Sequence, residues 1–140
     1  MPVVKFMKIH PSAKIPTKGT AGSACYDIYA VERVALNHHV STVRTGLKME
    51  IPSGYMVEVR PRSGLAKMGV ILPNAPCTID SDYRGELLVL MMSLQGECIL
   101  AAGARIAQMR LVKLVDTVFV VTEKLSETIR GEGAFGSTGS

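Results

Sequence analysis

The segment YMVEVR, Tyr55–Arg60, alternates between two kinds of side chain along its length. Tyr55, Val57 and Val59 fall on one face of an extended chain, because successive side chains of a strand point to opposite sides. Pro-Ser-Gly immediately before it is typical of a turn, and Pro61 ends the pattern since proline has no backbone N–H for a ladder. The segment is therefore predicted to be a β-strand.

Short runs of the same type recur along the chain, with glycine and proline between them. They are Val3–Ile9, Val34–Val43, Gly46–Ile51, Ile106–Leu114 and Val118–Thr122. Glu86–Ser93 (ELLVLMMS) is almost continuously apolar, which predicts a strand covered on both faces. Ser63–Gly69 is the only helical pattern, with Ser63 as N-cap and Gly69 as the stop. Many short strands at close spacing predict a sandwich, jelly roll or barrel.

Length and composition predict one domain with a sufficient core. The chain has 140 residues, is 47% hydrophobic and only 5% aromatic, and contains no tryptophan. Its formal charge of +4 is scattered, so it admits an anionic partner without indicating a nucleic-acid surface. Its apolar runs are far shorter than the ~18 residues of a spanning helix, and no signal peptide is evident. Three cysteines without a CxxC pair are expected to be free thiols of a cytoplasmic protein.

The last eleven residues, Arg130–Ser140, differ in kind from the rest, with four glycines and one large apolar side chain. Such a segment cannot pack a core, and it is expected to be mobile unless a ligand or a neighbouring chain orders it. It could wrap a flat anionic ligand through its arginine, phenylalanine and hydroxyl side chains. A plain disordered terminus is the alternative on composition alone.

Pro61-Arg62-Ser63-Gly64 lies where a predicted strand meets the predicted helix. Backbone N–H groups at a helix start favour phosphate, and Arg62 adds a fork of donors. Ser63 adds a hydroxyl, and Gly64 lets the backbone approach a ligand closely. An ordinary capped helix with a surface arginine explains the same residues equally well.

The densest polar stretch is Asn74-Ala-Pro-Cys-Thr-Ile-Asp-Ser-Asp-Tyr-Arg-Gly-Glu86. Asn74 begins it as a turn residue whose amide can both donate to and accept from a base edge. Asp80 and Asp82 would share a face of a strand, with Tyr83 on the other face. A carboxylate there, ionised at neutral pH, could activate water beside a phosphate site. A polar turn with surface ion pairs is the alternative.

Three other features leave their roles open. Gln108 follows Arg105 at the start of a strand, where alternation places it with Ile106, and it is either an edge residue or a placed amide. Asp27 follows a small-residue turn, which suits a cap or a contact to metal-bound water equally. His38-His39 is expected to be a solvated pair with no third metal ligand.

Five stretches, taken in order, resemble the motifs of the deoxyuridine triphosphatase (dUTPase) family in its trimeric branch. They are AGSACYD (21–27), PRSGLA (61–66), NAPCTIDSDYRGE (74–86), GARIAQM (103–109) and RGEGAFGSTG (130–139). The resemblance implies an all-β, distorted jelly-roll or β-sandwich domain of the β-clip-like dUTPase fold over residues 1–123, with one short helix. It implies a mobile C-terminal arm over 124–140 that carries a glycine-rich lid. It also implies a homotrimer with sites shared between subunits, and neither membrane nor stable nucleic-acid binding.

The same resemblance implies Mg²⁺-dependent hydrolysis of dUTP to dUMP and pyrophosphate, which limits uracil incorporation into DNA and supplies dUMP for thymidylate synthesis. Asp80 would orient and deprotonate the attacking water, and Tyr83 would lie under the deoxyribose and exclude a 2′-hydroxyl. Asp27 would touch the water shell of a Mg²⁺ bound mainly by the triphosphate. The other substrate-binding residues would be Asn74, Thr78 and Ile79 for uracil, and Arg62, Ser63, Gly64 and Gln108 for the phosphates. Leu88 would also bind substrate, as would Arg130, Phe135, Gly136, Ser137 and Thr138 of the arm.

The sequence departs from the family pattern at four positions. Glycine is usual where Cys25, Cys77 and Ala134 stand, an acid is usual at Ala104, and one residue is missing between motifs two and three. If the backbone at Cys77 requires a positive φ, its side chain costs about 1–2 kcal/mol. A catalytically impaired, dUTP-binding or regulatory relative is therefore the alternative function. A related deoxycytidine triphosphate deaminase and a nucleic-acid binder are the weaker alternatives, since no residue pattern favours them.

Overall fold

The computed structural model describes residues 1–136 and 139. Its elements are β1 (Lys5–Lys8), β2 (Tyr26–Tyr29), β3 (Val34–Leu36), β4 (Ser41–Glu50), β5 (Tyr55–Arg60), α1 (Ser63–Lys67), β6 (Val70–Ile71), β7 (Cys77–Ile79), β8 (Glu86–Ser93), β9 (Cys98–Leu100) and β10 (Arg105–Lys113). The strands at Tyr55–Arg60 and Glu86–Ser93 have the predicted bounds. The prediction of an all-β fold with one short helix is confirmed.

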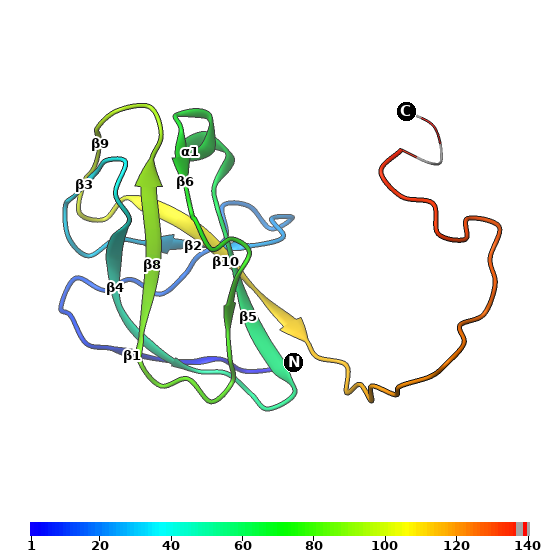
Figure 1. The fold of residues 1–140 in the computed structure, drawn as a ribbon. Coiled ribbons are helices and arrows are strands. Elements are labelled where there is room, and N and C mark those ends of the chain that lie inside the picture. The colour runs from blue at the N-terminus through cyan, green and yellow to red at the C-terminus, as the bar shows by residue number, and fades with distance from the viewer. Residues whose placement is uncertain (137–138, 140) are drawn as a thin grey trace.

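Two four-stranded antiparallel sheets build the body (Figure 1). One has the order β1-β4-β8-β6 and the other β2-β10-β5-β7, while β3 and β9 form a small third sheet. Strands far apart in sequence are neighbours in both large sheets, which is the topology of a jelly-roll-like sandwich.

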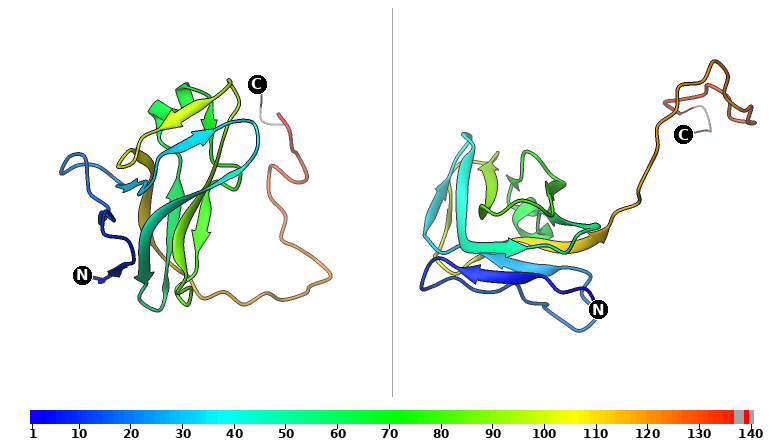
Figure 2. Two further views of the ribbon diagram at one scale, coloured as in Figure 1. Left: turned by 90° about the vertical axis from the view of Figure 1, so that its left-hand side faces the viewer. Right: turned by 90° about the horizontal axis from the view of Figure 1, so that it is seen from below.

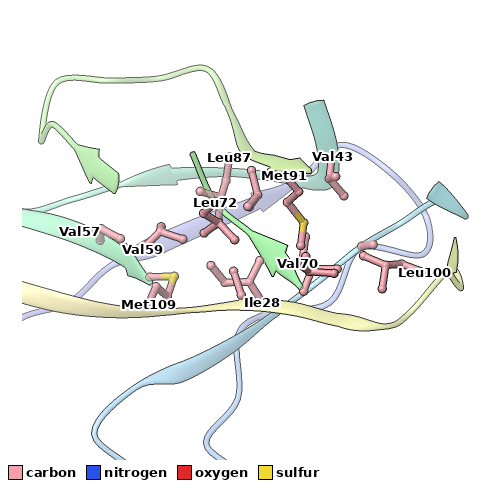
Figure 3. Packing of buried hydrophobic residues seen from close by; sticks show 14 of the residues in the cluster. Ile28, Val43, Val57, Val59, Val70, Leu72, Leu87, Met91, Leu100 and Met109 are labelled. Carbon is pink, nitrogen blue, oxygen red and sulfur yellow. The ribbon is translucent and has the colours of Figure 1, made fainter. Parts of the chain in front are cut away.

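The core lies between the large sheets and is aliphatic (Figure 3). Leu87 and Met91 of β8 belong to one cluster with Ile28 of β2 and Val57 of β5, and all four side chains are fully buried. Methionine and branched aliphatic side chains fill the space that aromatic residues occupy in many other cores, as the composition predicts.

The prediction that β8 is covered on both faces is wrong for the single chain. Its inward residues Leu87, Val89 and Met91 are buried, whereas Leu88 on the outward face is 41% exposed and Leu90 is half-buried. The apolar run therefore alternates in burial although it does not alternate in polarity. The outward side chains of β8 do not belong to this chain's own core.

Two strand predictions fail at irregularities of the backbone. Val34–Val43 is not one strand, because β3 ends at Leu36 and a turn follows before β4. Gly46 does not start a new strand, because it lies inside β4 at a register shift against β8, with φ +69°. A side chain at Gly46 would lie 2.7 Å from His10 Cβ, so the bulge requires glycine both for its backbone and for space.

A second bulge changes the faces of β10. The ladder with β2 shifts register between Arg105 and Ala107, and both Ile106 and Ala107 are fully buried. The prediction that Ile106 and Gln108 share a face is therefore wrong. Beyond the bulge, Ala107 and Met109 point into the core, and Gln108 is only partly buried.

The short helix ends as predicted but begins differently. Gly69, with φ +85°, follows α1, and its N–H donates to the carbonyl of Ala66. The N-cap position is taken by Arg62, without a side-chain capping bond, and Ser63 is the first helical residue. Ser63 as N-cap is therefore a wrong prediction.

Residues 114–136 contain no helix or strand, so the strand predicted at Val118–Thr122 is wrong. They lead away from the body as an extended arm (Figures 1 and 2). Val118, Phe119, Val120 and Val121 are all at least 79% exposed, so this apolar run does not pack on the described body of the chain. The domain boundary predicted at residue 123 stays a prediction, and the last strand ends before it at Lys113. No helix among residues 1–136 is long and apolar enough to span a membrane.

Candidate functional site

A recess of about 190 Å³ opens where β7 ends and β8 begins. Its walls are Thr78, Ile79, Asp80, Tyr83, Glu86 and Leu88. Strand β7 is held in place by pairing with β5, with Thr78 opposite Glu58 and Cys77 opposite Val59. Five of the six lining residues are ones that the sequence predicts for substrate binding or catalysis, so the structure brings this predicted group together.

Asp80 and Tyr83 are placed by a turn, not by a strand. Asp80 follows the last residue of β7, and the N–H of Tyr83 donates to the carbonyl of Asp80 at 3.2 Å. The prediction that Asp80 and Asp82 share a strand face is therefore wrong. Both side chains are exposed, which leaves the Asp80 carboxylate accessible at the recess.

The Tyr83 side chain is fixed at its tip. Its hydroxyl donates to the carbonyl of Glu86 at 2.8 Å, which closes a short loop from the turn back to the start of β8. The ring nevertheless stays 41% exposed, so one side of it is available to a ligand in the recess.

Glu86 is the recess residue that sequence reasoning missed as a site residue, since it was considered only for a surface ion pair. Its carboxylate, 14% exposed, accepts three hydrogen bonds of 3.0–3.2 Å from Arg44 Nε and Nη2, and one of 3.0 Å from Gly46 N–H. These interactions with Glu86, and weaker ones with Glu32, raise the pKa of Arg44. The bulge of β4 is thus tied to the base of the recess.

Asn74 lies in the exposed turn before β7, as predicted. The thiol of Cys77 donates to Asn74 Oδ1 at 3.3 Å, and partial burial raises the pKa of that thiol, which keeps it protonated as a donor. Among the described residues other than glycine, only Phe135 has a positive φ. Cys77 therefore has ordinary strand backbone. The backbone strain that a positive φ at Cys77 would cause is absent.

A second group of predicted residues gathers around Asp27 on β2. Arg62 Nε lies 3.3 Å from Asp27 Oδ1, and Arg105 Nη1 lies 3.7 Å from Asp27 Oδ2. Arg62 Nη1 also donates to the carbonyl of Arg105 at 3.2 Å. One carboxylate thus holds two guanidinium groups on neighbouring elements, a function that neither interpretation of Asp27 anticipated.

Gln108 is a placed amide. Its Nε2 donates to the carbonyl of Pro61 at 2.9 Å, which connects β10 to the residues before α1. Ser63 and Gly64 follow at the start of α1, both exposed. The predicted phosphate-binding residues of the body therefore lie on one connected surface.

The residues of this surface suit Mg²⁺ only if substrate phosphates and water supply most of its ligands. No group of three His, Cys, Asp or Glu side chains suited to a metal occurs within residues 1–136 and 139. Asp27 is a single carboxylate that is already paired with two arginines. Mg²⁺ keeps several waters and is often held by one carboxylate together with substrate phosphates. The residues present suit that arrangement and do not suit a cage made by protein alone.

The arm keeps its predicted site residues away from the body. Arg130 Nε donates to Gly133 O at 2.9 Å, within the arm. Phe135 is fully exposed and has φ 49°, and Gly136 follows it with φ 96°. Ser137 and Thr138, predicted for the phosphates, lie outside the described residues. His38 and His39 are exposed, as expected, with their rings 4.2 Å apart.

Within the described part of the chain, no hydrogen bond or ion pair joins the recess, the Asp27 group and the arm. The predicted site residues thus form three separate groups in one chain. The fold and these groups define a jelly-roll-like protein with a polar recess and an arginine-bearing surface suited to phosphate.

Comparison with known proteins agrees with this description. A family model described as dUTPase matches residues 11–139. The chain is 42% identical over 140 residues to the deoxyuridine 5'-triphosphate nucleotidohydrolase of a Picosynechococcus strain, covering 98% of this chain and 99% of that protein. It is 44% identical over 139 residues to the enzyme of that name from Helicobacter pylori, covering 97% and 96%. The chain belongs to the dUTPase family.

Solved structures support the fold. The dUTPase of Staphylococcus bacteriophage 80alpha, determined with dUPNHPP, superposes with a TM-score of 0.86 at 23% identity and covers 99% of both chains. A dUTPase variant from phage phi11 of S. aureus, described as coordinating a structural Mg(II) ion, has a TM-score of 0.78 at 18% identity over 87% of this chain and 97% of that one. At these identities the likeness concerns the fold alone.

Proposed function

We propose that this protein is a dUTP diphosphatase that hydrolyses dUTP to dUMP and pyrophosphate. The observation that carries the proposal is the recess, because it gathers the residues expected for base, sugar and water in one place. Thr78 and Ile79 bind the base, Tyr83 the sugar, and Asp80 the attacking water, with Leu88 as the apolar wall.

Selection of uracil falls to the β7 backbone and to Asn74. Backbone N–H and C=O groups of a paired strand are fixed in direction, so they reject cytosine, whose donor and acceptor pattern is reversed at the exocyclic position. The ladder between β5 and β7 and the bond from Cys77 to Asn74 supply that rigidity. A site whose donors cannot turn leaves a wrong base with unpaired polar groups.

Tyr83 distinguishes deoxyribose from ribose. Its hydroxyl is bound to Glu86 O, so the ring cannot withdraw freely when a 2′-hydroxyl approaches. Asp80 then acts at the near end of the triphosphate as a general base for water, a role that contributes typically 10²–10⁴-fold to a rate.

Arg62, Ser63, Gly64 and Gln108 hold the phosphates on the surface next to Asp27. Hydrolysis at phosphorus needs positioning and charge neutralisation more than covalent chemistry, and a guanidinium group supplies both. Asp27 would contact the water shell of Mg²⁺, and the ion would supply further charge neutralisation at the triphosphate. Because Asp27 already orients Arg62, the carboxylate prepares the cation before substrate arrives.

The separation of the three groups leads us to propose that the complete site forms between copies of this chain. In a homotrimer the recess of one subunit faces the Asp27 group of a second, and an arm closes over both. Arg130, Phe135, Gly136, Ser137 and Thr138 then act as a lid that excludes bulk water. The exposed outward face of β8 is a suitable contact surface for a partner subunit. The arm from residue 124 onward acts as a unit separate from the body.

The protein acts in the cytoplasm in this proposal. Cys25, Cys77 and Cys98 are free, and unpaired thiols fit a reducing compartment. Neither a membrane nor a stable nucleic-acid partner is required for hydrolysis of a free nucleotide.

The test is release of pyrophosphate from dUTP, dTTP, dCTP and UTP with Mg²⁺, together with the molecular mass in solution. We expect release from dUTP alone and the mass of a trimer. Binding of dUTP without hydrolysis would reject the enzyme in favour of a regulatory relative, and ammonia released from dCTP would point to deaminase chemistry.

A further inference from the structure

Gly85 lies directly against the side chain of Tyr83. A β-carbon added at Gly85 would lie 2.5 Å from Tyr83 Cζ and 2.8 Å from Cε1, and it would overlap the phenolic oxygen. The φ of Gly85 is outside the left-handed range, so its backbone conformation suits any residue. Glycine is needed here for space and not for backbone freedom.

Hydrogen bonds hold Tyr83 at the tip of its side chain and at its backbone N–H, from which the side chain starts. At the tip, the hydroxyl of Tyr83 donates to the carbonyl of Glu86, the residue that follows Gly85. At the base, the N–H of Tyr83 donates to Asp80 O. Glu86 is itself fixed by Arg44 and by Gly46 N–H, so the carbonyl that anchors the ring has little freedom to follow a displaced hydroxyl.

We infer that Gly85 is a specificity-determining residue, because its missing side chain sets the position of the Tyr83 ring that the sugar meets. The inference rests on the proposed function. Gly85 is not among the residues that line the recess, so it acts as a positioning residue through Tyr83.

The distances indicate how much displacement a side chain would cause. Carbon atoms pack at about 3.5–4.0 Å, so the ring tip would have to move by about 1 Å to make room for a methyl group at Gly85. Exclusion of a 2′-hydroxyl depends on contact at the same scale, and a misplacement of about 1 Å can change a rate about 10²-fold. Discrimination between dUTP and UTP should therefore be more sensitive to Gly85 than folding is.

The experiment measures kcat/KM for dUTP and for UTP in the full-length protein and in Gly85→Ala. We expect the dUTP/UTP ratio to fall at least about tenfold in Gly85→Ala. Gly19→Ala is the matched control, because its added β-carbon meets Ser23 Oγ at an ordinary 3.7 Å, and it should leave the ratio unchanged. In a Tyr83→Ala background, Gly85→Ala should have no further effect, since the ring that it displaces is gone.

The outcomes separate the two proposals. If the unmodified protein shows no preference for dUTP, the proposed function fails. If it prefers dUTP and Gly85→Ala keeps the full ratio, or lowers it equally with Tyr83→Ala present, the role of Gly85 is overturned. Should Gly85→Ala alone fail to fold, the double variant with Tyr83→Ala is expected to unfold at the temperature of Tyr83→Ala, and an unfolded double variant would contradict the inference.

Discussion

The recess and the arm differ in how the chain's own fold holds their side chains. Two recess side chains have partners from the fold, since Tyr83 bonds to the carbonyl of Glu86 and the Glu86 carboxylate to Arg44. Beside the recess, Cys77 bonds to Asn74. The described arm residues 115–136 are almost all exposed, and the hydrogen bonds they make with other described residues stay within the arm.

The difference assigns two separate tasks. A recess that is formed before substrate binds can choose the base and the sugar without paying for reorganisation. An arm whose residues 115–136 bond only within the arm can act only after substrate or a second subunit provides a partner. Changes at the recess residues that meet base and sugar should therefore alter selectivity. Changes in the arm should alter turnover while leaving the body folded, as should loss of the Asp80 carboxylate.

The largest effect is expected for Asp80→Asn, which keeps the shape of the recess and removes its base. kcat for dUTP should fall by roughly 10²–10⁴-fold, the usual contribution of a general base. Binding of dUTP should persist, because Asp80 is exposed and only its backbone carbonyl bonds to Tyr83. Pyrophosphate release and equilibrium binding of dUTP are the measurements, and a near-normal rate would remove Asp80 from its role.

A chain truncated after Ile129 tests the arm. Arg130 and Phe135 make no hydrogen bond to the body in the part of the chain that the structure describes, so Tm should change very little. kcat should fall by about 10²-fold because the lid and its arginine are lost. Thermal unfolding and dUTP turnover decide it, with the full-length chain as control, and a clear loss of Tm would show that the arm packs on the body.

Local patterns explain how much of the recess could be predicted from the sequence. Strand β5 alternates in polarity, β8 is continuously apolar, and the polar stretch from Asn74 to Glu86 is contiguous. The residues that line the recess all lie between 78 and 88, so most of them could be predicted from one contiguous stretch of sequence.

Contacts over long sequence separation could not be predicted in the same way. Arg44 and Glu86 are 42 residues apart, and they meet through the register of β4 with β8. Arg105 reaches Asp27 beside a bulge that shifts the alternation of β10. Bulges insert a residue without a composition signal, so period-2 reasoning fails beyond them.

Glu86→Gln is the next smaller change, and it tests whether the recess is rigid because of this partly buried carboxylate. The amide keeps the size but loses the charge that binds Arg44, so Tm should fall by several degrees. KM for dUTP should rise several-fold while kcat changes less, since Tyr83 depends on the backbone at Glu86. Lys5→Gln is a matched control, because it breaks an exposed ion pair with Glu50 in which no recess residue takes part. Equal effects of the two variants would contradict the special role of Glu86.

The smallest effect is expected for Cys77→Gly, which restores the residue usual at this position. Glycine inside a strand loses about 0.5–1 kcal/mol relative to a residue with a side chain, and the thiol bond to Asn74 is lost as well. Cys77 lies in ordinary β7 backbone, so glycine relieves no strain there. We therefore expect a slightly lower Tm and a KM for dUTP raised by no more than about threefold, with Cys77→Ser close to the unmodified protein because it keeps a donor. A rise in kcat on Cys77→Gly would instead show that the cysteine impairs the enzyme. The bond from Cys77 to Asn74 would then not help to position uracil.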